Sequence, residues 1–321
     1  MNGFLTVCYH YIRPSVNDPF PRLLGTREDV FREHVAALRE AFQVISLPEA
    51  IEFSHGNASF EQGKPGLLFT FDDGLSDHYT AARILSEYSI RGVFFIPASI
   101  FEDNLPINPV IIHYTLAHYG IGKFLQAYQD ALRSRGIAGK EHAITFTKGV
   151  DDPMQTISKI KSTFKYKLSH GNARAILLFI YRNLFEKDFP NAMEIMHLNR
   201  GHIKEMLDMG HHIGSHTHSH PSIASAHLSD EDFKREVLYP KEYMESTFGT
   251  KVNAFSYPFG EEQDYAGSDE LVHKSGAYQL AFTVDRFLNT REVSPSRLGR
   301  YAVYSTDSAE KIIQDLRGMI K

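Results

Sequence analysis

The stretch GLLFTFDDG, residues 66–74, begins as a mostly apolar run and ends in two adjacent carboxylates followed by a glycine. Such a run is typical of a buried β-strand. In parallel α/β domains the active site lies where strands end, so Asp72 and Asp73 stand in a functional position. Because Asp-Asp-Gly also occurs in ordinary turns, the stretch alone predicts a strand that ends in either a turn or a site.

The sequence on both sides of this strand alternates between strand and helix patterns. Further strands are predicted at 5–9, 92–97, 211–215, 254–258, 279–284 and 298–303, and helices at 76–88, 269–275 and 307–319. Thr26 and Asp29 have the spacing of a helix N-cap, and Ser229 and Asp232 repeat it before a helix that Gly249 ends. This alternation favours an α/β fold with a parallel sheet and crossover helices.

Residues 101–198 interrupt the alternation. Helical periodicity occurs at 110–119, 123–135 and 173–185, without a convincing strand. We therefore expect an α/β domain made of residues 1–100 and 199–321, with a mainly helical insertion at 101–198. Four lysines of the insertion fit either a solvated helix face or a clamp for a phosphorylated substrate or carrier: Lys159, Lys161, Lys165 and Lys167.

The composition excludes several classes of protein. The 321 residues include 34 basic and 39 acidic side chains, and the formal net charge of −5 lacks the basic excess of a nucleic-acid-binding protein. A single cysteine, Cys8, excludes an internal disulfide and a thiolate zinc cluster. Apolar runs fall short of the ~18 residues of a membrane helix, and the N-terminal run is shorter than that of a signal peptide. We expect a cytoplasmic protein, at most peripheral to the inner face of the membrane, of open oligomeric state.

The 17 histidines include a cluster, HTHSH, that starts at His216. On a helical turn the four-residue spacing would place His216 and His220 on one face, where two imidazoles can hold one metal ion, and His218 on the other side. With Asp73 they form a set of ligands that suits Zn²⁺ and leaves a position open for water. Asp72 is then the candidate general base.

Hydrolysis of an amide needs two further groups, a donor for the oxyanion and an acid for the leaving amine. A backbone N–H in the turn formed by Pro258, Phe259 and Gly260 is the candidate oxyanion donor. A histidine can supply the proton to the amine.

Three motifs occur in a characteristic order: TFDDG at 70–74, HTHSH at 216–220 and FSYPFG at 255–260. Together they resemble the polysaccharide deacetylases, the NodB-homology group or carbohydrate esterase family 4, over roughly residues 4–100 and 200–305. The resemblance implies a distorted (β/α) barrel with Asp72 as the catalytic base. It implies that a divalent metal, Zn²⁺ or otherwise Co²⁺, Ni²⁺, Mn²⁺ or Fe²⁺, is held by Asp73, His216 and His220. It assigns substrate and oxyanion contacts to Tyr257, Pro258 and Phe259.

The chain also departs from the family pattern. Ser256 stands where the family has an arginine, Phe259 replaces a tyrosine, tryptophan is absent, and no histidine follows His273 to supply a late Leu-x-His motif. These departures resemble the poly-N-acetylglucosamine deacetylase branch, in which an N-terminal Tyr-His segment supplies a catalytic histidine. The resemblance therefore points to His10 as the general acid. Arg300, at the end of a predicted strand, is the candidate to orient Asp72.

The function that follows is metal-dependent removal of acetyl from the amide of an amino sugar, in a glycan or glycan precursor of cell-surface polysaccharide biosynthesis. The expected substrate is an N-acylated sugar, including a nucleotide-sugar or a lipid-linked glycan. The insertion, with its lysines and the aromatic residues Phe164 and Tyr166, is a candidate lid or membrane-facing part that recognises it. Three alternatives stay open: a deformylase or other amidohydrolase, a catalytically silent glycan-binding protein, and a non-haem iron oxygenase. The last is disfavoured because its two-histidine, one-carboxylate set usually lies on an all-β frame.

Overall fold

The structure, a computed structural model, describes residues 2–60, 64–137 and 143–320. Eight strands form its main sheet: β1 (Phe4–Tyr9), β4 (Gln43–Val44), β5 (Gly66–Phe71), β6 (Val93–Ile96), β7 (His212–Ser215), β8 (Ala254–Ser256), β9 (Leu280–Phe282) and β10 (Tyr301–Ala302). Their order is β10-β1-β5-β6-β7-β8-β9, with β4 added to β5, and neighbouring strands are parallel. The α/β fold predicted from the alternation is confirmed.

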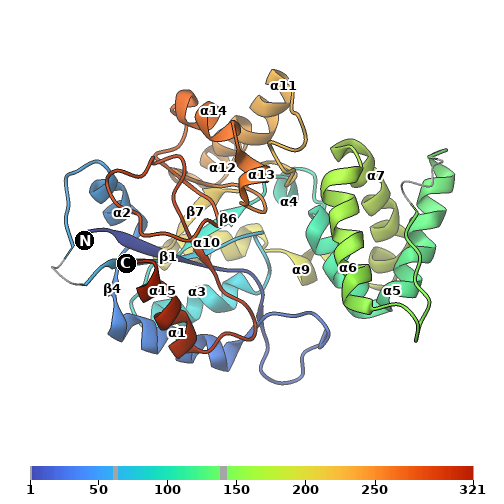
Figure 1. Cartoon of the computed structure of the whole chain (residues 1–321), viewed down its shortest axis with the longest axis horizontal. Helices are drawn as coiled ribbons and strands as arrows, with labels where there is room; N and C mark the ends of the chain where they lie inside the picture. The colour runs from blue at the N-terminus through green and yellow to red at the C-terminus, as the bar shows by residue number, and fades with distance from the viewer. Residues whose placement is uncertain (1, 61–63, 138–142, 321) are drawn as a thin grey trace.

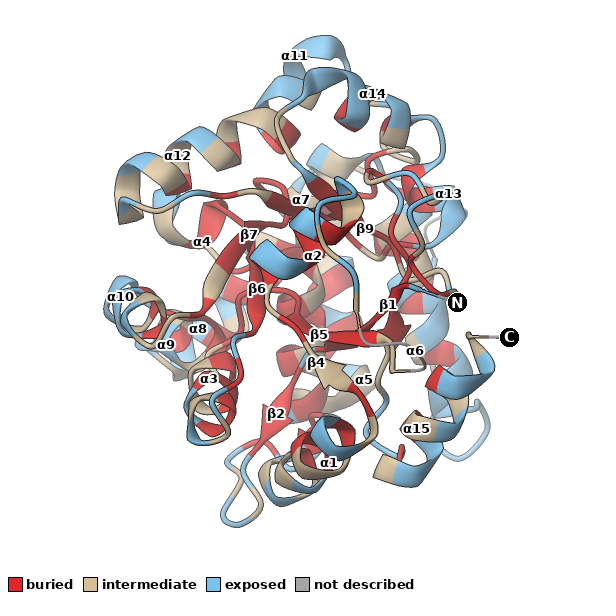
Figure 2. Ribbon diagram, turned by 90° about the vertical axis from the view of Figure 1, so that its left-hand side faces the viewer, coloured by how far each residue is buried: buried red, intermediate tan, exposed pale blue. Residues whose placement is uncertain are grey.

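The central strands are apolar because both of their faces are covered. Every residue of β1, β5 and β6 is buried, and Figure 2 shows these strands in the buried core. The register pairs Val7 with Phe69 and Tyr9 with Phe71, so the C-terminal ends of β1 and β5 coincide. Parallel strands with covered faces read as continuous apolar runs, which is the pattern of the predicted strands.

The sheet curls into a half-barrel whose two edges are approached by one late segment. Leu298 forms a parallel bridge to Phe282 of β9, while Tyr301 and Ala302 of β10 pair with β1 at the other edge. Arg300 lies between these two contacts and is fully buried. The curvature therefore carries Arg300 into the interior of the barrel.

Helices connect the strands along the outside of the barrel (Figure 1). The longer ones are α1 (Glu28–Ala41), α2 (Leu47–Ser54), α3 (His78–Glu87), α10 (Arg200–Asp208), α12 (Tyr239–Phe248), α14 (Ser268–Ser275) and α15 (Ala309–Gly318). Short elements are β2 (Ile12–Arg13), β3 (Thr26–Arg27), α4 (Ser99–Glu102), α11 (Asp230–Phe233), η4 (Lys234–Leu238) and α13 (Glu262–Tyr265).

The two predicted N-caps have different outcomes. Ser229 caps α11 by accepting a hydrogen bond from the backbone of Asp232, and Gly249 ends α12 in a left-handed conformation, as predicted. The cap at Thr26 is wrong, because Thr26 belongs to β3 and its N–H donates to the carbonyl of Tyr11. Pairing with a distant strand competes with the local cap and displaces the start of α1.

Within residues 101–198, all the secondary-structure elements that the structure describes are helices. They are α5 (Asn108–Ser134), α6 (Pro153–Ser162), η2 (Thr163–Lys167, a π-helical turn), α7 (His170–Ile180), η3 (Tyr181–Phe185), α8 (Glu186–Asp188) and α9 (Ala192–Met196). The two helices predicted at 110–119 and 123–135 are confirmed as the two parts of α5, which the non-helical Gly120, with a φ of 79°, separates by a kink. Figure 1 shows α5, α6 and α7 packed together beside the barrel. Among the described residues, no helix has the length and apolar character that crossing a membrane requires.

Candidate active site

The turn after β5 presents both aspartates at the C-terminal edge of the sheet. The N–H of Asp72 continues the sheet by donating to the carbonyl of Tyr9 at 3.1 Å. Asp73 and Gly74 then adopt left-handed conformations, with φ of 82° and 56°. Both carboxylates are buried. A left-handed aspartate is tolerated where the surrounding structure holds it, and such strain is concentrated at functional sites.

The histidine motif forms a loop after β7, and this corrects the helical turn that its spacing suggested. Thr217 and His220 have φ of 64° and 65°, which no right-handed helix contains. The Thr217 hydroxyl accepts a hydrogen bond from the His220 N–H at 3.0 Å. This tight turn, rather than helical periodicity, brings the rings of His216 and His220 to 4.7 Å. His218 does point elsewhere, toward Glu102.

Asp73, His216 and His220 converge as a possible metal site. The Nε2 atoms of His216 and His220 lie 3.4 and 3.1 Å from Oδ1 of Asp73, which is buried without a hydrogen-bond partner among the described residues. Two ligand atoms about 2.0 Å from a tetrahedral Zn²⁺ lie about 3.3 Å apart. The Nδ1 atom of His216 is 2.8 Å from the carbonyl of Ser256, which turns Nε2 toward Asp73. The three residues therefore fit a divalent ion.

Asp72 is held by a buried arginine. The guanidinium of Arg300 donates to both carboxylate oxygens, at 2.8 and 2.7 Å, and its Nε donates to the carbonyl of Thr283. The hydroxyl of Ser256 donates to Asp72 at 3.0 Å and accepts from Arg300 at 2.8 Å. Ser256 and Arg300 thus both contact the carboxylate of Asp72.

This network also determines the charge of Asp72. Burial would raise the pKa of the carboxyl, but the charge of Arg300, followed by that of His216, outweighs burial and holds the pKa below its ordinary range. Asp72 is therefore ionised at neutral pH. Arg300 and Ser256 leave its carboxylate oriented as well as charged.

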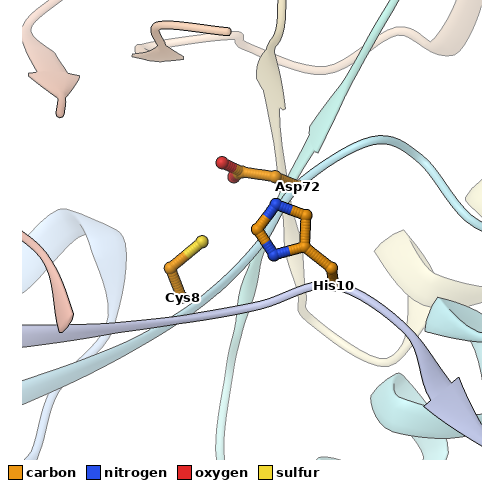
Figure 3. Close-up of side chains that lie close together, drawn as sticks. All are labelled: Cys8, His10 and Asp72. Atoms are coloured by element: carbon orange, nitrogen blue, oxygen red, sulfur yellow. The ribbon is translucent and has the colours of Figure 1, made fainter. Parts of the chain in front are cut away.

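Figure 3 shows His10 and Cys8 beside Asp72, at the end of β1. One nitrogen or sulfur atom of each lies within 4.8 Å of an Asp72 oxygen. The carbonyl of His10 is 3.1 Å from Nε2 of His78, so the backbone of this corner is held from α3. Burial raises the pKa of the Cys8 thiol, which stays protonated and does not act as a nucleophile.

The third motif divides between the site and the core. Phe259, with a φ of 64°, lines the cavity, and its ring lies 4.8 Å from that of His220. Its backbone N–H donates no hydrogen bond within the described part of the chain. The prediction of a substrate contact is wrong for the side chain of Tyr257, which is buried and donates to the carbonyl of Ser296 at 2.9 Å. Pro258 does not line the cavity either.

Comparison with known families agrees with this geometry. The family model described as polysaccharide deacetylase matches residues 60–277. The chain belongs to the polysaccharide deacetylase family. The match runs from the strand before Asp72 to beyond the third motif, and it confirms the family predicted from those motifs.

Individual relatives of this deacetylase-family chain are distant. A peptidoglycan-N-acetylglucosamine deacetylase of Bacillus cereus is 26% identical over 121 residues, which are 38% of this chain and 37% of the relative. The Streptococcus pyogenes deacetylase PplD in complex with acetate superimposes with a TM-score of 0.61 at 16% identity, over 98% of both chains. IcaB from Ammonifex degensii gives a TM-score of 0.57 at 16% identity, over 99% and 98% of the two chains. These two likenesses show the barrel fold.

The deacetylase-family barrel does not form the cavity alone. A cavity of about 740 Å³ contains the metal-ligand set, Asp72 and His10, and the insertion supplies its opposite wall. That wall includes Phe164 and Tyr166, which the sequence placed with the lysines in the candidate lid. It also includes residues that the sequence did not assign to the site: Asn108, Ile112, His113 and His170. Helical residues far from the motifs carry no mark of which cavity they face.

Proposed function

We propose that this protein hydrolyses the N-acetyl amide of an amino sugar in a cell-surface glycan or its precursor, with a divalent metal held by Asp73, His216 and His220. One observation supports this most directly. The three ligands lie in one cavity with a carboxylate, Asp72, that a buried arginine keeps ionised and oriented. A metal site next to an oriented base is the arrangement that amide hydrolysis needs.

The chain's own residues divide the work of this reaction. A bound Zn²⁺ would polarise the carbonyl and favour ionisation of water. Asp72 takes the proton of the attacking water, while Arg300 and Ser256 hold its oxygens in place. The free N–H of Phe259 donates to the oxygen that becomes negative as the carbonyl carbon turns tetrahedral. His10 then gives a proton to the amine that leaves.

The proposed substrate is a glycan or glycan precursor that carries an N-acetylated amino sugar. Among the relatives, the Bacillus cereus protein is a peptidoglycan-N-acetylglucosamine deacetylase, and PplD is a deacetylase in complex with acetate. Polymer, nucleotide-sugar and lipid-linked forms all carry the amide that the site would cleave. Among the described residues, no contact in the cavity favours a deformylase or a catalytically silent glycan-binding protein. The cytoplasmic location also stays a prediction from the sequence.

Substitution of the base and removal of the metal test this function together. Released acetate is measured with N-acetylglucosamine oligomers, N-acetylglucosamine 1-phosphate and a nucleotide-linked N-acetylglucosamine. Asp72→Asn should lower kcat by about 100-fold or more, because the base is lost while the metal ligands remain. Asp208→Asn, an exposed aspartate at the end of α10, is the matched control and should leave kcat unchanged.

Chelation should abolish acetate release, and Zn²⁺ or Co²⁺ should restore it. Full activity in metal-free protein would reject the metal-dependent mechanism. An Asp72→Asn variant as active as the parent would reject Asp72 as the base. Release of formate but not acetate from matched N-acyl sugars would favour the deformylase alternative.

A further inference from the structure

The two walls of the active-site cavity differ in charge. On the barrel wall, Asp72 is paired with Arg300, and Asp73 faces the two histidines. On the insertion wall, the ammonium of Lys165 lies 2.9 Å from the buried Asp264 carboxylate and 4.2 Å from the ring centroid of Phe259. Lys165 is therefore already neutralised by the barrel.

Lys161, at the end of α6, lines the same cavity without such a partner. Within the described parts of the chain, no carboxylate lies within ion-pair distance of its ammonium. Lys161 is exposed to solvent, so an incoming ligand can reach its ammonium, and desolvation by the surrounding protein lowers the pKa of this group. A cation without an acidic partner in a cavity attracts negatively charged ligands.

Neutral donors accompany this lysine. His113 of α5 lines the cavity, and its Nδ1 lies 3.2 Å from the hydroxyl of Tyr11. Burial, followed by the charge of Lys161, lowers the pKa of His113 to about 3, so at neutral pH the ring is uncharged. Its Nε2 has no hydrogen-bond partner in the part of the chain that the structure describes. Ser158, one turn before Lys161 on α6, lines the same wall.

We propose that Lys161, with His113 and Ser158, forms a subsite for a phosphoryl group attached to the amino sugar. The proposal rests on the proposed function, since it names the substrate that the same cavity would take. A phosphoryl group offers several acceptor oxygens and a negative charge, and an ammonium binds it as a point charge. Lys161 and His113 line the same cavity of about 740 Å³ as the metal-ligand set, so one substrate in this cavity can contact both the subsite and the ligands.

Calorimetric titration of metal-free protein tests the subsite without catalysis. The parent should bind N-acetylglucosamine 1-phosphate about tenfold or more tightly than N-acetylglucosamine. Lys161→Met keeps the apolar stem and should remove most of that difference. Lys159→Met is the matched control, because Lys159 is on the same helix but does not line the cavity, and it should keep the difference.

Each outcome has one meaning. If the parent binds N-acetylglucosamine 1-phosphate no more tightly than N-acetylglucosamine, the subsite proposal is wrong. A preference that survives Lys161→Met overturns the assignment to Lys161. A preference that depends on Lys161, without acetate release from any N-acetyl sugar after metal loading, supports the subsite and rejects the proposed function.

Two substrates distinguish the possible sources of the phosphoryl group, which are a nucleotide and a lipid carrier. Acetate release is compared for a nucleoside diphosphate sugar and a short prenyl diphosphate sugar, each with the parent and with Lys161→Met. The better substrate identifies the source, and Lys161→Met should raise its KM by about tenfold with little change in kcat. Unchanged KM for both substrates would contradict the subsite.

Discussion

The charge of Asp72 depends on a residue that lies 228 positions later in the chain. Arg300 is fully buried and binds both oxygens of Asp72, while Ser256 bridges the two side chains. A planar guanidinium can make this paired contact, whereas an ammonium of the same charge can satisfy only one oxygen at a time. Arg300 is thus a positioning residue, since it acts on the reaction through Asp72.

Arg300→Lys is therefore expected to lower kcat by about 10- to 100-fold with little change in KM, because the charge remains while the orientation of Asp72 is lost. Steady-state kinetics of acetate release would measure both constants. Arg291→Lys, which changes an exposed arginine, serves as the control and should behave as the parent. A kcat within about twofold of the parent would show that the orientation of Asp72 does not depend on the paired hydrogen bonds from the guanidinium.

At the scale of elements, η2 links the insertion to the barrel. Lys165 pairs with Asp264 at 2.9 Å, and Asp264 also accepts from Ser222 at 2.6 Å and from Tyr166 at 3.3 Å. On α7, Nε2 of His170 lies 2.8 Å from the hydroxyl of Ser219, within the histidine loop. The wall of the cavity is therefore held by polar contacts to a buried carboxylate rather than by apolar packing alone.

Asp264→Asn should loosen this link, because the largely buried Lys165 ammonium would lose its charged partner. Amide hydrogen exchange in α6 and η2 should become about tenfold faster or more, while exchange in β5 stays as in the parent. Glu261→Gln is the control, since Glu261 lies farther from the lysine, at 3.7 Å, and is mostly exposed. Equal exchange rates for Asp264→Asn and Glu261→Gln would mean that the ion pair does not hold the insertion.

At the scale of the whole molecule, several buried histidines are neutral in the folded protein. Burial lowers the pKa of His78 and His113 to about 3, and that of His211 to about 4. His211 accepts a hydrogen bond from the N–H of Gly92 through Nδ1, and its Nε2 lies 2.9 Å from the carbonyl of Ala82. The ring of His211 therefore connects α3 to the residue that precedes β6, and it does so in the neutral form.

The folded protein is therefore expected to lose stability as the pH falls from about 6.5 to 4. The unfolded chain protonates these histidines near their ordinary pKa of about 6.5, whereas the folded protein keeps them neutral, so unfolding takes up protons. Each such ring adds about 1.4 kcal/mol per pH unit to the slope of the unfolding free energy near pH 5.

His211→Gln should reduce that slope by about one such increment. Urea unfolding of metal-free protein at several pH values between about 4.5 and 7 would measure it, with His55→Gln, at an exposed position, as the control. The metal ligands titrate in all the variants, so their effect cancels in the comparison. Identical slopes for the parent and His211→Gln would contradict a neutral, buried His211.

The sequence by itself determined the parallel strand that ends in Asp72 and Asp73, the family, and the helical character of residues 101–198. These features depend on apolar periodicity and on short spacings, which local chemistry dictates. The sequence named Arg300, the His216 and His220 pair and Lys161 only as candidates. The tertiary structure placed Arg300 on Asp72, formed the left-handed turn between the two histidines, turned Tyr257 into the core and brought Lys161 to the cavity. Those contacts join residues distant in the chain or depend on left-handed turns. They follow from the curvature of the sheet and from the packing of the insertion against it, and no local sequence pattern encodes either feature.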